Sequence, residues 1–212
     1  MPDLRYLMVD GHGDPNTSPA YRDAIGALYP VAYKLKFISK RELGRDYVVP
    51  PLEGLWWADD MDTFTVARDK SRWNWTLMLM VPGWIDDGSF PTAIGQAGAK
   101  DRPRRLDDIR LETLSEGLCV QTLHVGPFDA EGPVLERMHH GFIPEHGLRM
   151  AGLHHEIYLS DARRAAPNVC ARCCANPSPR CRGPIPSGRR WSGHHGATRT
   201  LPEQSEAAAR NA

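Results

Sequence analysis

The stretch "YLMVDGHGDP" (6–15), followed by "NTSPAYRDAIGALYPVAYKLKF" (16–37), decides the fold. The first segment is an apolar run that ends in a glycine-rich turn, which predicts a short strand. The second segment has apolar residues at helical spacing, so it predicts a helix with Ser18 as N-cap and Pro19 as the first helical residue. Pro30 lies inside this helix and predicts a kink.

A second copy of this pattern occurs later in the chain. "TLHVGPFDAEGP" (122–133) again places a glycine turn after an apolar strand, and residues 129–147 predict the helix that follows. The same order of elements in both halves predicts two pseudo-repeats, at about 4–88 and 89–167. Two strand–helix–strand–strand modules give an α+β fold with antiparallel pairing.

The remaining segments predict further strands and one short helix. They are an extended segment at 46–59, a strand at 71–82, a helix at 89–101 and a hairpin at 110–128. Proline cannot donate to a strand ladder, so Pro50 and Pro51 predict that 46–59 is an edge strand or contains a bulge. Both faces of 71–82 are largely apolar, which predicts that both are covered.

Length and charge exclude several classes of protein. The chain has 212 residues, with 26 Lys+Arg and 26 Asp+Glu, so its formal net charge is zero. This balance gives no electrostatic reason to expect a nucleic-acid or membrane partner. The sequence contains no apolar run long enough to cross a bilayer, and its start lacks the features of a signal peptide. We therefore expect a soluble, cytoplasmic protein.

The character of the sequence changes after residue 167. Residues 1–167 predict a folded domain, whereas 168–212 are rich in Arg, Pro, Gly and Ser and predict a disordered tail. Cys170 and Cys173 have C-x-x-C spacing, and a third cysteine and two histidines follow, so a zinc site is an alternative. The turns and apolar residues of a zinc module are missing, which favours a tail without metal.

The segment "GLHHEIYLSD" (152–161) places a charged residue in the middle of a predicted strand. Strand alternation puts His154, Glu156 and Tyr158 on one face. The other face carries Leu153, His155, Ile157 and Leu159. It is mostly apolar, and we expect it to meet the helices. If Glu156 instead faces water, it is an ordinary surface residue. If it faces a cleft, it pairs with a cationic ligand or acts as a base or acid.

Tryptophan is concentrated in one part of the chain. Five of the six tryptophans fall between residues 56 and 84. Core packing explains such a concentration, but tryptophan also lines binding pockets because it offers a wide flat face and a polar N–H. Four further histidines are interpreted as structural or surface residues: His12, His124, His139 and His140.

Four long motifs carry a resemblance to a known family. They are "PLEGLWWADD" (51–60), "WNWTLMLMVP" (73–82), "EGLCVQTLHVGPFDAEGP" (116–133) and "HHEIYLSDARRAAP" (154–167). Together with "DGHGDPNTSPAYRDAIGALYPVAYKLKF" (10–37) they resemble the GyrI-like small-molecule-binding family, in particular its stand-alone branch. The resemblance covers residues 4–167. It implies a duplicated SHS2 fold, as in bacterial transcription-activator effector-binding domains, with a ligand cleft between the modules.

The resemblance also implies a function. In the wider family a glutamate on a late strand contacts bound drugs, and the motif places it at Glu156. Some stand-alone members use an aromatic cage to hydrolyse the strained cyclopropane of DNA-alkylating antibiotics such as yatakemycin and CC-1065. The expected site combines catalytic Glu156 and Tyr158 with a ligand-binding set of Tyr33, Trp56, Trp57, Trp73, Trp75 and His154. A flat aromatic or cationic ligand is expected, with no metal or organic cofactor; the alternative is a module that only binds drugs.

The chain departs from the family pattern in two places. Ala162 stands where the family motif has proline, and the tail after Pro167 replaces the family's usual ending. An abrupt loss of the family pattern together with a change of composition is what a frameshift produces, so a shifted reading frame is a further hypothesis for residues 168–212. Sequencing the gene again would settle it.

Overall fold

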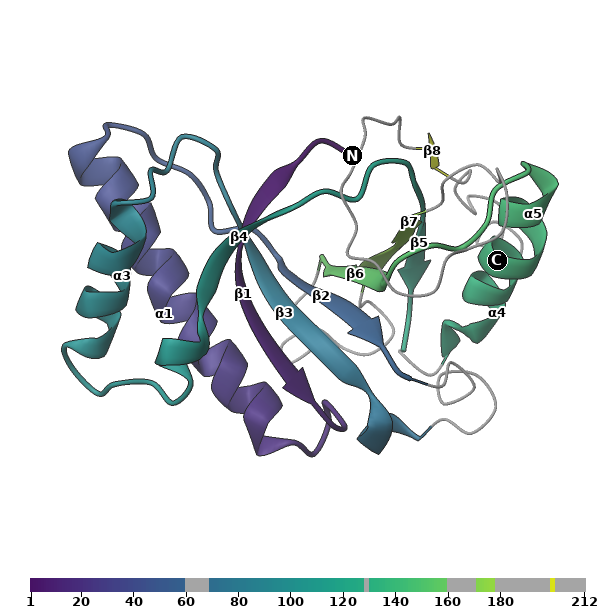
Figure 1. Ribbon diagram of the computed structural model, residues 1–212, viewed down its shortest axis with the longest axis horizontal. Coiled ribbons are helices and arrows are strands. Elements are labelled where there is room, and N and C mark those ends of the chain that lie inside the picture. Colours follow the sequence, from purple (N-terminus) through teal and green to yellow (C-terminus); the bar gives the residue numbers. More distant parts are fainter. Residues whose placement is uncertain (60–68, 128–129, 160–170, 178–198, 201–212) are drawn as a thin grey trace, which may run out of the picture. The chain divides into compact units, whose positions relative to one another are not determined.

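The computed structural model describes residues 1–59, 69–127, 130–159, 171–177 and 199–200. The chain divides into two compact units, coloured by sequence in Figure 1. The α1 unit comprises Asp3–Leu114 and His155–Ile157. The α4 unit comprises Met1–Pro2, Ser115–His154 and Tyr158–Ala212. The repeat boundary expected near residue 88 stays a prediction, since the compact units divide the chain after Leu114.

The α1 unit is a sheet with helices. In chain order its elements are β1 (Leu4–His12), α1 (Pro19–Glu42), β2 (Leu52–Trp57), the 3₁₀ turn η1 (Lys70–Arg72), β3 (Asn74–Val81), α3 (Ser89–Gly98), the 3₁₀ turn η2 (Leu106–Asp108) and β4 (Arg110–Leu114). The sheet order is β4-β1-β3-β2-β6, and the middle of β6 (His154–Tyr158) belongs to this unit. The pairs β1–β3, β1–β4 and β2–β3 are antiparallel, so the predicted α+β fold with an antiparallel sheet is confirmed.

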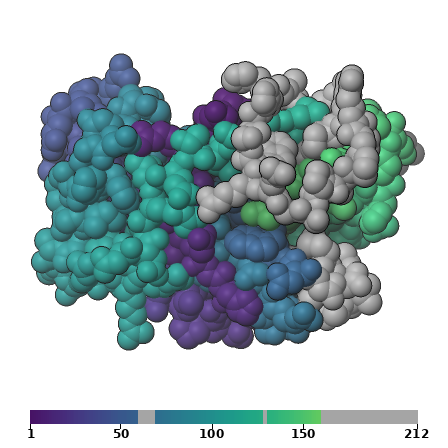
Figure 2. Space-filling model, in the orientation of Figure 1, coloured from purple at the N-terminus to yellow at the C-terminus, as the bar shows by residue number. Residues whose placement is uncertain are grey.

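The helix α1 starts where the sequence predicts. Ser18 has an extended backbone and Pro19 is the first helical residue. The helix continues through Pro30 to Glu42, and it buries a stripe of apolar side chains that includes Leu28, a residue with no exposed surface. Helix α3 packs beside it in the same unit (Figure 1). Figure 2 shows that α3 and the segments flanking it form a continuous surface on this side of the unit.

The prediction that the second strand lies at an edge is wrong. β2 lies between β3 and β6, so both of its sides are hydrogen-bonded. The physical reason is where the strand begins. Pro50 and Pro51 precede its first residue, Leu52, so neither proline removes an N–H from the ladder.

The predicted hairpin over 110–128 is also wrong. β4 lies at the sheet edge and pairs with β1, whereas β5 (Cys119–Val125) lies between β7 and β8 in the α4 unit. The Ser-Glu-Gly turn therefore joins two units and not two paired strands. Leu111 pairs opposite the fully buried Leu7, so β4 occupies the edge of the sheet beside β1.

The α4 unit has a core of its own. Its helical region runs through α4 (Gly132–Glu136), the π-helix η4 (Arg137–Phe142) and α5 (Ile143–Glu145). Its core cluster contains Val120, Met138, Ile143 and Leu148. The predicted helix over 129–147 is therefore present, although a π-helical turn interrupts it.

Part of the predicted tail forms strands. Ala171–Pro177 form β7, which pairs antiparallel with β5, and Arg199–Thr200 form the short strand β8, which runs parallel to β5. The prediction of disorder does not hold for these segments, because backbone hydrogen bonds form a ladder without needing apolar side chains. The rest of the tail lies outside the described residues.

The glycine turn after β1 carries a specific close contact. Gly11 pairs with Trp75 across β1 and β3, and the indole lies directly over it. A Cβ added at Gly11 would fall 2.0 Å from a ring carbon of Trp75. The indole Nε1 also donates a hydrogen bond to the carbonyl oxygen of Gly13, at 3.2 Å. The "DGHG" turn therefore provides the packing surface and the hydrogen-bond acceptor for the indole of Trp75.

We expect Gly11→Ala to lower the free energy of unfolding by about 2–3 kcal/mol, because the new methyl overlaps a buried ring. Urea unfolding followed by tryptophan fluorescence measures this. Gly95→Ala is the matched control: a Cβ there meets nothing within 4 Å, so the α3 helix should gain up to about 1 kcal/mol. Equal effects of the two substitutions would contradict the packing argument.

Candidate functional site

A buried carboxylate and a buried imidazole meet in the α1 unit. Glu53 lies on β2 and His155 on the neighbouring strand β6. His155 Nε2 lies 2.9 Å from Glu53 Oε2, and the two side chains are only 1% and 7% exposed. Glu53 sits within an otherwise apolar strand because this partner satisfies its carboxylate.

The two faces of this sheet carry different chemistry. Residues directly opposite each other in antiparallel strands share a face, so Glu53 shares one with Met78, and Trp56 shares the other with Trp75. His155 lies on the Glu53 face, since the two side chains are hydrogen-bonded. Strand alternation then places Glu156 on the face that carries Trp56 and Trp75.

This face differs from the sequence expectation for β6. The residues alternating with Glu156 were expected to meet the helices, yet Tyr21 of α1 contacts Trp56 and Trp75, so α1 covers the Glu156 face. The physical reason is the hydrogen bond between His155 and Glu53, which lies on the reverse face of the sheet. It turns His155 to that face and therefore turns Glu156 towards α1. Glu156 itself is 6% exposed.

An aromatic cluster gathers on the α1-covered face. It consists of Tyr21, Trp56, Trp73 and Trp75. Tyr21 stacks on Trp56 at 6.1 Å between ring centroids and meets Trp75 edge-on at 5.2 Å. Trp73 meets Trp56 edge-on at 5.8 Å. These offset and edge-to-face arrangements are the favourable ones for aromatic rings.

The cluster already carries cationic groups. Lys70 Nζ lies 5.8 Å from the ring centroid of Trp73, and the guanidinium of Arg105 lies 5.9 Å from that of Trp75. Arg105 also donates a hydrogen bond from Nη2 to the carbonyl oxygen of Asp10, at 2.6 Å. The rings therefore offer faces at which a positive charge is stabilised.

The predicted ligand-binding residues of the α1 unit do not all lie together. Trp56, Trp73 and Trp75 belong to the cluster, but Trp75 has no exposed surface and forms its floor. Trp57 is half-buried on the Glu53 face. Tyr33 is 48% exposed, beside Tyr29 on the outer side of α1.

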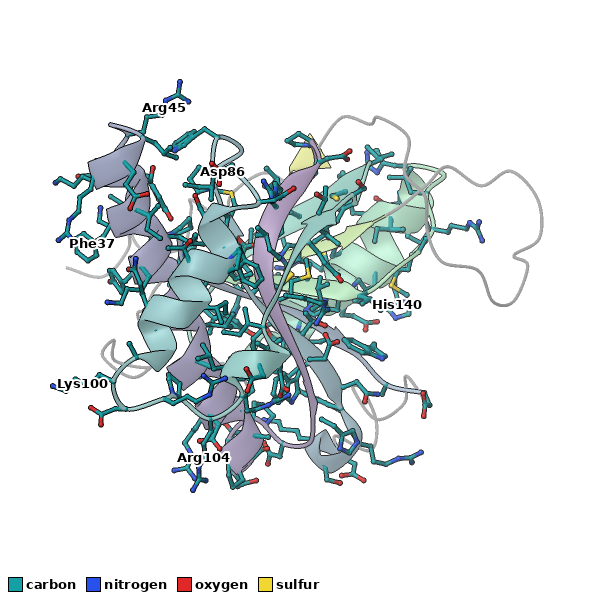
Figure 3. The ribbon with its side chains drawn as sticks, turned by 60° about the vertical axis from the view of Figure 1, so that its left-hand side comes forward. Phe37, Arg45, Asp86, Lys100, Arg104 and His140 are labelled. Carbon is teal, nitrogen blue, oxygen red and sulfur yellow. The ribbon has the colours of Figure 1, made fainter. Side chains whose placement is uncertain are left out.

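Figure 3 shows Phe37 on the outer side of α1. Phe37, one turn after Tyr33, points away from the sheet and is 43% exposed. Residues four apart on a helix share a face, so Tyr33 points the same way. Its assignment to the ligand site stays a prediction of the sequence.

Two predicted residues belong to the α4 unit. His154 and Tyr158 are half-buried at the two ends of β6. The ring of His154 meets that of His139 edge-on, at 6.4 Å between centroids. Burial lowers the pKa of His139 to about 4, and the nearby His154 and His140 add to this effect. His139 is therefore neutral at pH 7.

Sequence reasoning missed Glu53, His155, Tyr21 and Arg105. Glu53 had a usable signal, because a carboxylate inside "PLEGLWW" is the same anomaly as Glu156 inside "HHEIY". Tyr21 and Arg105 had none, since only the packing of α1 and the η2 turn brings them to the cluster.

Metal binding has no support in the described part of the chain. No group of three or more His, Cys, Asp or Glu side chains that could hold a metal ion occurs among the described residues. The side chains of the tail cysteines and histidines considered for zinc lie outside those residues. The described arrangement offers a buried carboxylate on the same sheet face as an aromatic cluster, which suits a cationic ligand or proton transfer.

Comparison with known proteins identifies the family. The GyrI-like small molecule binding domain matches residues 1–171. The chain belongs to the GyrI-like family. This GyrI-like chain is therefore a small-molecule-binding domain. The sequence matches none of the curated proteins with which it was compared.

Solved structures from Listeria innocua resemble this GyrI-like protein closely. One is an uncharacterized conserved protein, with 37% sequence identity and a TM-score of 0.76, covering 84% of this chain and 89% of its own. Two are crystal structures of hydrolases, each with 36% identity and covering 84% of this chain and 88% of their own; their TM-scores are 0.74 and 0.72. Within the described residues of the GyrI-like chain, no helix is long and apolar enough to cross a membrane.

We expect the free energy of unfolding to fall as the pH is lowered from about 6.5 towards 4, by about 3 kcal/mol at most, because of His139. The folded protein keeps this imidazole neutral, whereas the unfolded chain binds a proton at its ordinary pKa. Above pH 6.5 both states are neutral and the contribution is complete.

Urea titrations between pH 5 and 7 measure this effect. His139→Phe should flatten the dependence. His140→Phe, at a side chain that is 68% exposed, should change it much less, because burial and not His140 is the main cause of the lowered pKa. An unaltered slope in His139→Phe would show that folding does not lower the pKa of this imidazole.

Proposed function

We propose that the protein binds flat aromatic or cationic small molecules and hydrolyses the strained cyclopropane of DNA-alkylating xenobiotics, which detoxifies them. The observation that carries the proposal is the position of Glu156. It is buried, and strand alternation puts it on the sheet face that holds the aromatic cluster. In such an arrangement the rings can stack on the flat body of a ligand, and the carboxylate can act at its reactive carbon.

The family and its relatives support this proposal. GyrI-like domains bind small molecules, and two similar structures from Listeria innocua are of hydrolases. Both share 36% of their residues with this chain over most of its length. Hydrolysis is the activity named for these relatives, and we extend it here to the opening of a cyclopropane.

The proposed reaction adds one water to the substrate. Glu156 accepts a proton from that water as its oxygen forms a bond to the cyclopropane carbon. The strained carbon–carbon bond breaks, and its electron pair moves through the conjugated ring to the carbonyl oxygen. Tyr158 or His154 donates a proton to that oxygen, giving a phenol, and the proton held by Glu156 then restores the donor.

The chemistry assigns different tasks to the two parts of the site. Ring strain supplies much of the driving force, so the proposed route needs no metal or organic cofactor. The aromatic cluster holds the flat ligand by burying its area and stacking on it. The product has lost its electrophilic ring and can no longer alkylate DNA.

A second candidate is a module that binds without catalysis. The cation contacts at Trp73 and Trp75 favour it, since Lys70 and Arg105 already place positive charges near these two rings. In this case Glu156 is the counter-charge of a cationic drug. The two functions differ in stoichiometry: a binding protein protects one ligand per site, whereas a hydrolase protects many.

We expect substoichiometric protein to convert many equivalents of a yatakemycin-class alkylator into its water adduct, measured by mass spectrometry. Glu156→Gln should lower kcat by about 100-fold or more, because the amide cannot accept the proton from water. Glu42→Gln, an exposed carboxylate at the end of α1, is the matched control and should retain full turnover. Binding with no turnover in the wild type would favour the drug-binding module.

We expect Trp73→Ala to weaken binding of a flat cationic dye such as ethidium by about tenfold, since it removes one aromatic face. Its melting temperature should change little, because Trp73 is half-buried outside the strand. Fluorescence titration measures the affinity. Phe37→Ala, on the outer side of α1, controls for loss of an aromatic ring, and an equal loss of affinity in both variants would argue against the cluster as the binding site.

A further inference from the structure

The Glu53–His155 pair occupies an unusual place in the sheet. Both residues lie on the reverse face from the aromatic cluster, and both are nearly inaccessible to water. The pair joins β2 to β6, which are hydrogen-bonded neighbours. β6 is the strand that carries Glu156, and His155 directly precedes Glu156 in it. The hydrogen bond of the pair therefore holds the backbone next to Glu156.

Stability alone is a poor explanation for the pair. Two ionisable groups buried in a sheet lose their hydration, and replacing such a pair by well-packed apolar residues is often neutral or stabilising. Where buried polar pairs are retained, their best-attested role is to specify one register among several. The apolar neighbour Met78, opposite Glu53, offers no alternative partner for the imidazole.

Register decides where Glu156 points. Side chains alternate between the two faces, so a slip of β6 by one residue would turn Glu156 to the reverse face and His155 towards the cluster. The hydrogen bond at 2.9 Å between Glu53 and His155 forms only in the observed register. A slipped strand would leave the Glu53 carboxylate buried without this partner, which is costly.

We propose that Glu53 and His155 are positioning residues that fix the register of β6 against β2 and so hold Glu156 on the aromatic face. Neither residue touches the reacting atoms. Their effect on catalysis rests on the proposed function, whereas their effect on register does not. In this proposal, the Glu53–His155 pair determines the sheet face towards which the Glu156 carboxylate points.

The test separates register from folding by using an apolar replacement of both partners. Glu53→Leu with His155→Leu removes both members of the hydrogen bond, so neither is left buried without the other, and the double variant should melt no lower than either single variant. We expect its kcat/KM towards a yatakemycin-class alkylator to fall about 100-fold even where it is fully folded, because the reacting carboxylate is misplaced. Glu53→Gln, which keeps an acceptor oxygen for His155, should retain activity within about tenfold.

Nuclear magnetic resonance of the 23.7 kDa protein reports on register directly. The cross-strand contacts between β2 and β6 should shift or double in the double leucine variant and stay unchanged in Glu112→Leu, which removes an exposed carboxylate on β4. A folded double variant with wild-type cross-strand contacts would overturn the proposal, as would one with shifted contacts and wild-type turnover. If the wild type does not turn over, the proposed function fails, and the cross-strand contacts alone decide the inference.

Discussion

The contact on which the α1 unit depends is the indole of Trp75 lying on Gly11. The ring occupies the space that any side chain at Gly11 would need, and it is anchored by its hydrogen bond to the Gly13 carbonyl. This fixes the end of β1 against β3. Tyr21 then meets the same indole edge-on and stacks on Trp56, which lies opposite Trp75 across β2 and β3, so one glycine makes room for the aromatic cluster. The local backbone and the core packing therefore share one cause.

The sheet of this unit separates two tasks by face. On one face α1 covers aromatic rings, and the neighbouring residue of β6 adds a buried carboxylate. On the other face a second carboxylate is hydrogen-bonded to an imidazole. Two buried glutamates thus lie in very different environments, one beside aromatic faces and one in a tight pair.

Much of the fold could be predicted from local pattern. The start of α1, the strand at β3 and the α+β class follow from apolar spacing, from the N-cap and proline at residues 18–19, and from the repeated glycine turn. The end of α1 does not, since the helix continues to Glu42, beyond the predicted end at residue 37. Two strand pairings could not be predicted. Nothing within residues 110–128 shows that β4 joins β1, because the partner lies about a hundred residues away. Likewise, the prolines before β2 mark where a strand begins but not its neighbours.

For the site, the sequence by itself determined that Glu156 is an anomaly and that tryptophans gather between residues 56 and 84. It also determined the family, because long sequence motifs can be recognised without any knowledge of the three-dimensional structure. Only the tertiary structure decided that Trp75 is a buried floor, that Tyr33 points outward and that His155 pairs with Glu53. Periodicity gives the two faces of a strand but does not say which face a helix will cover. That choice depends on contacts between residues far apart in the chain, which local pattern does not encode.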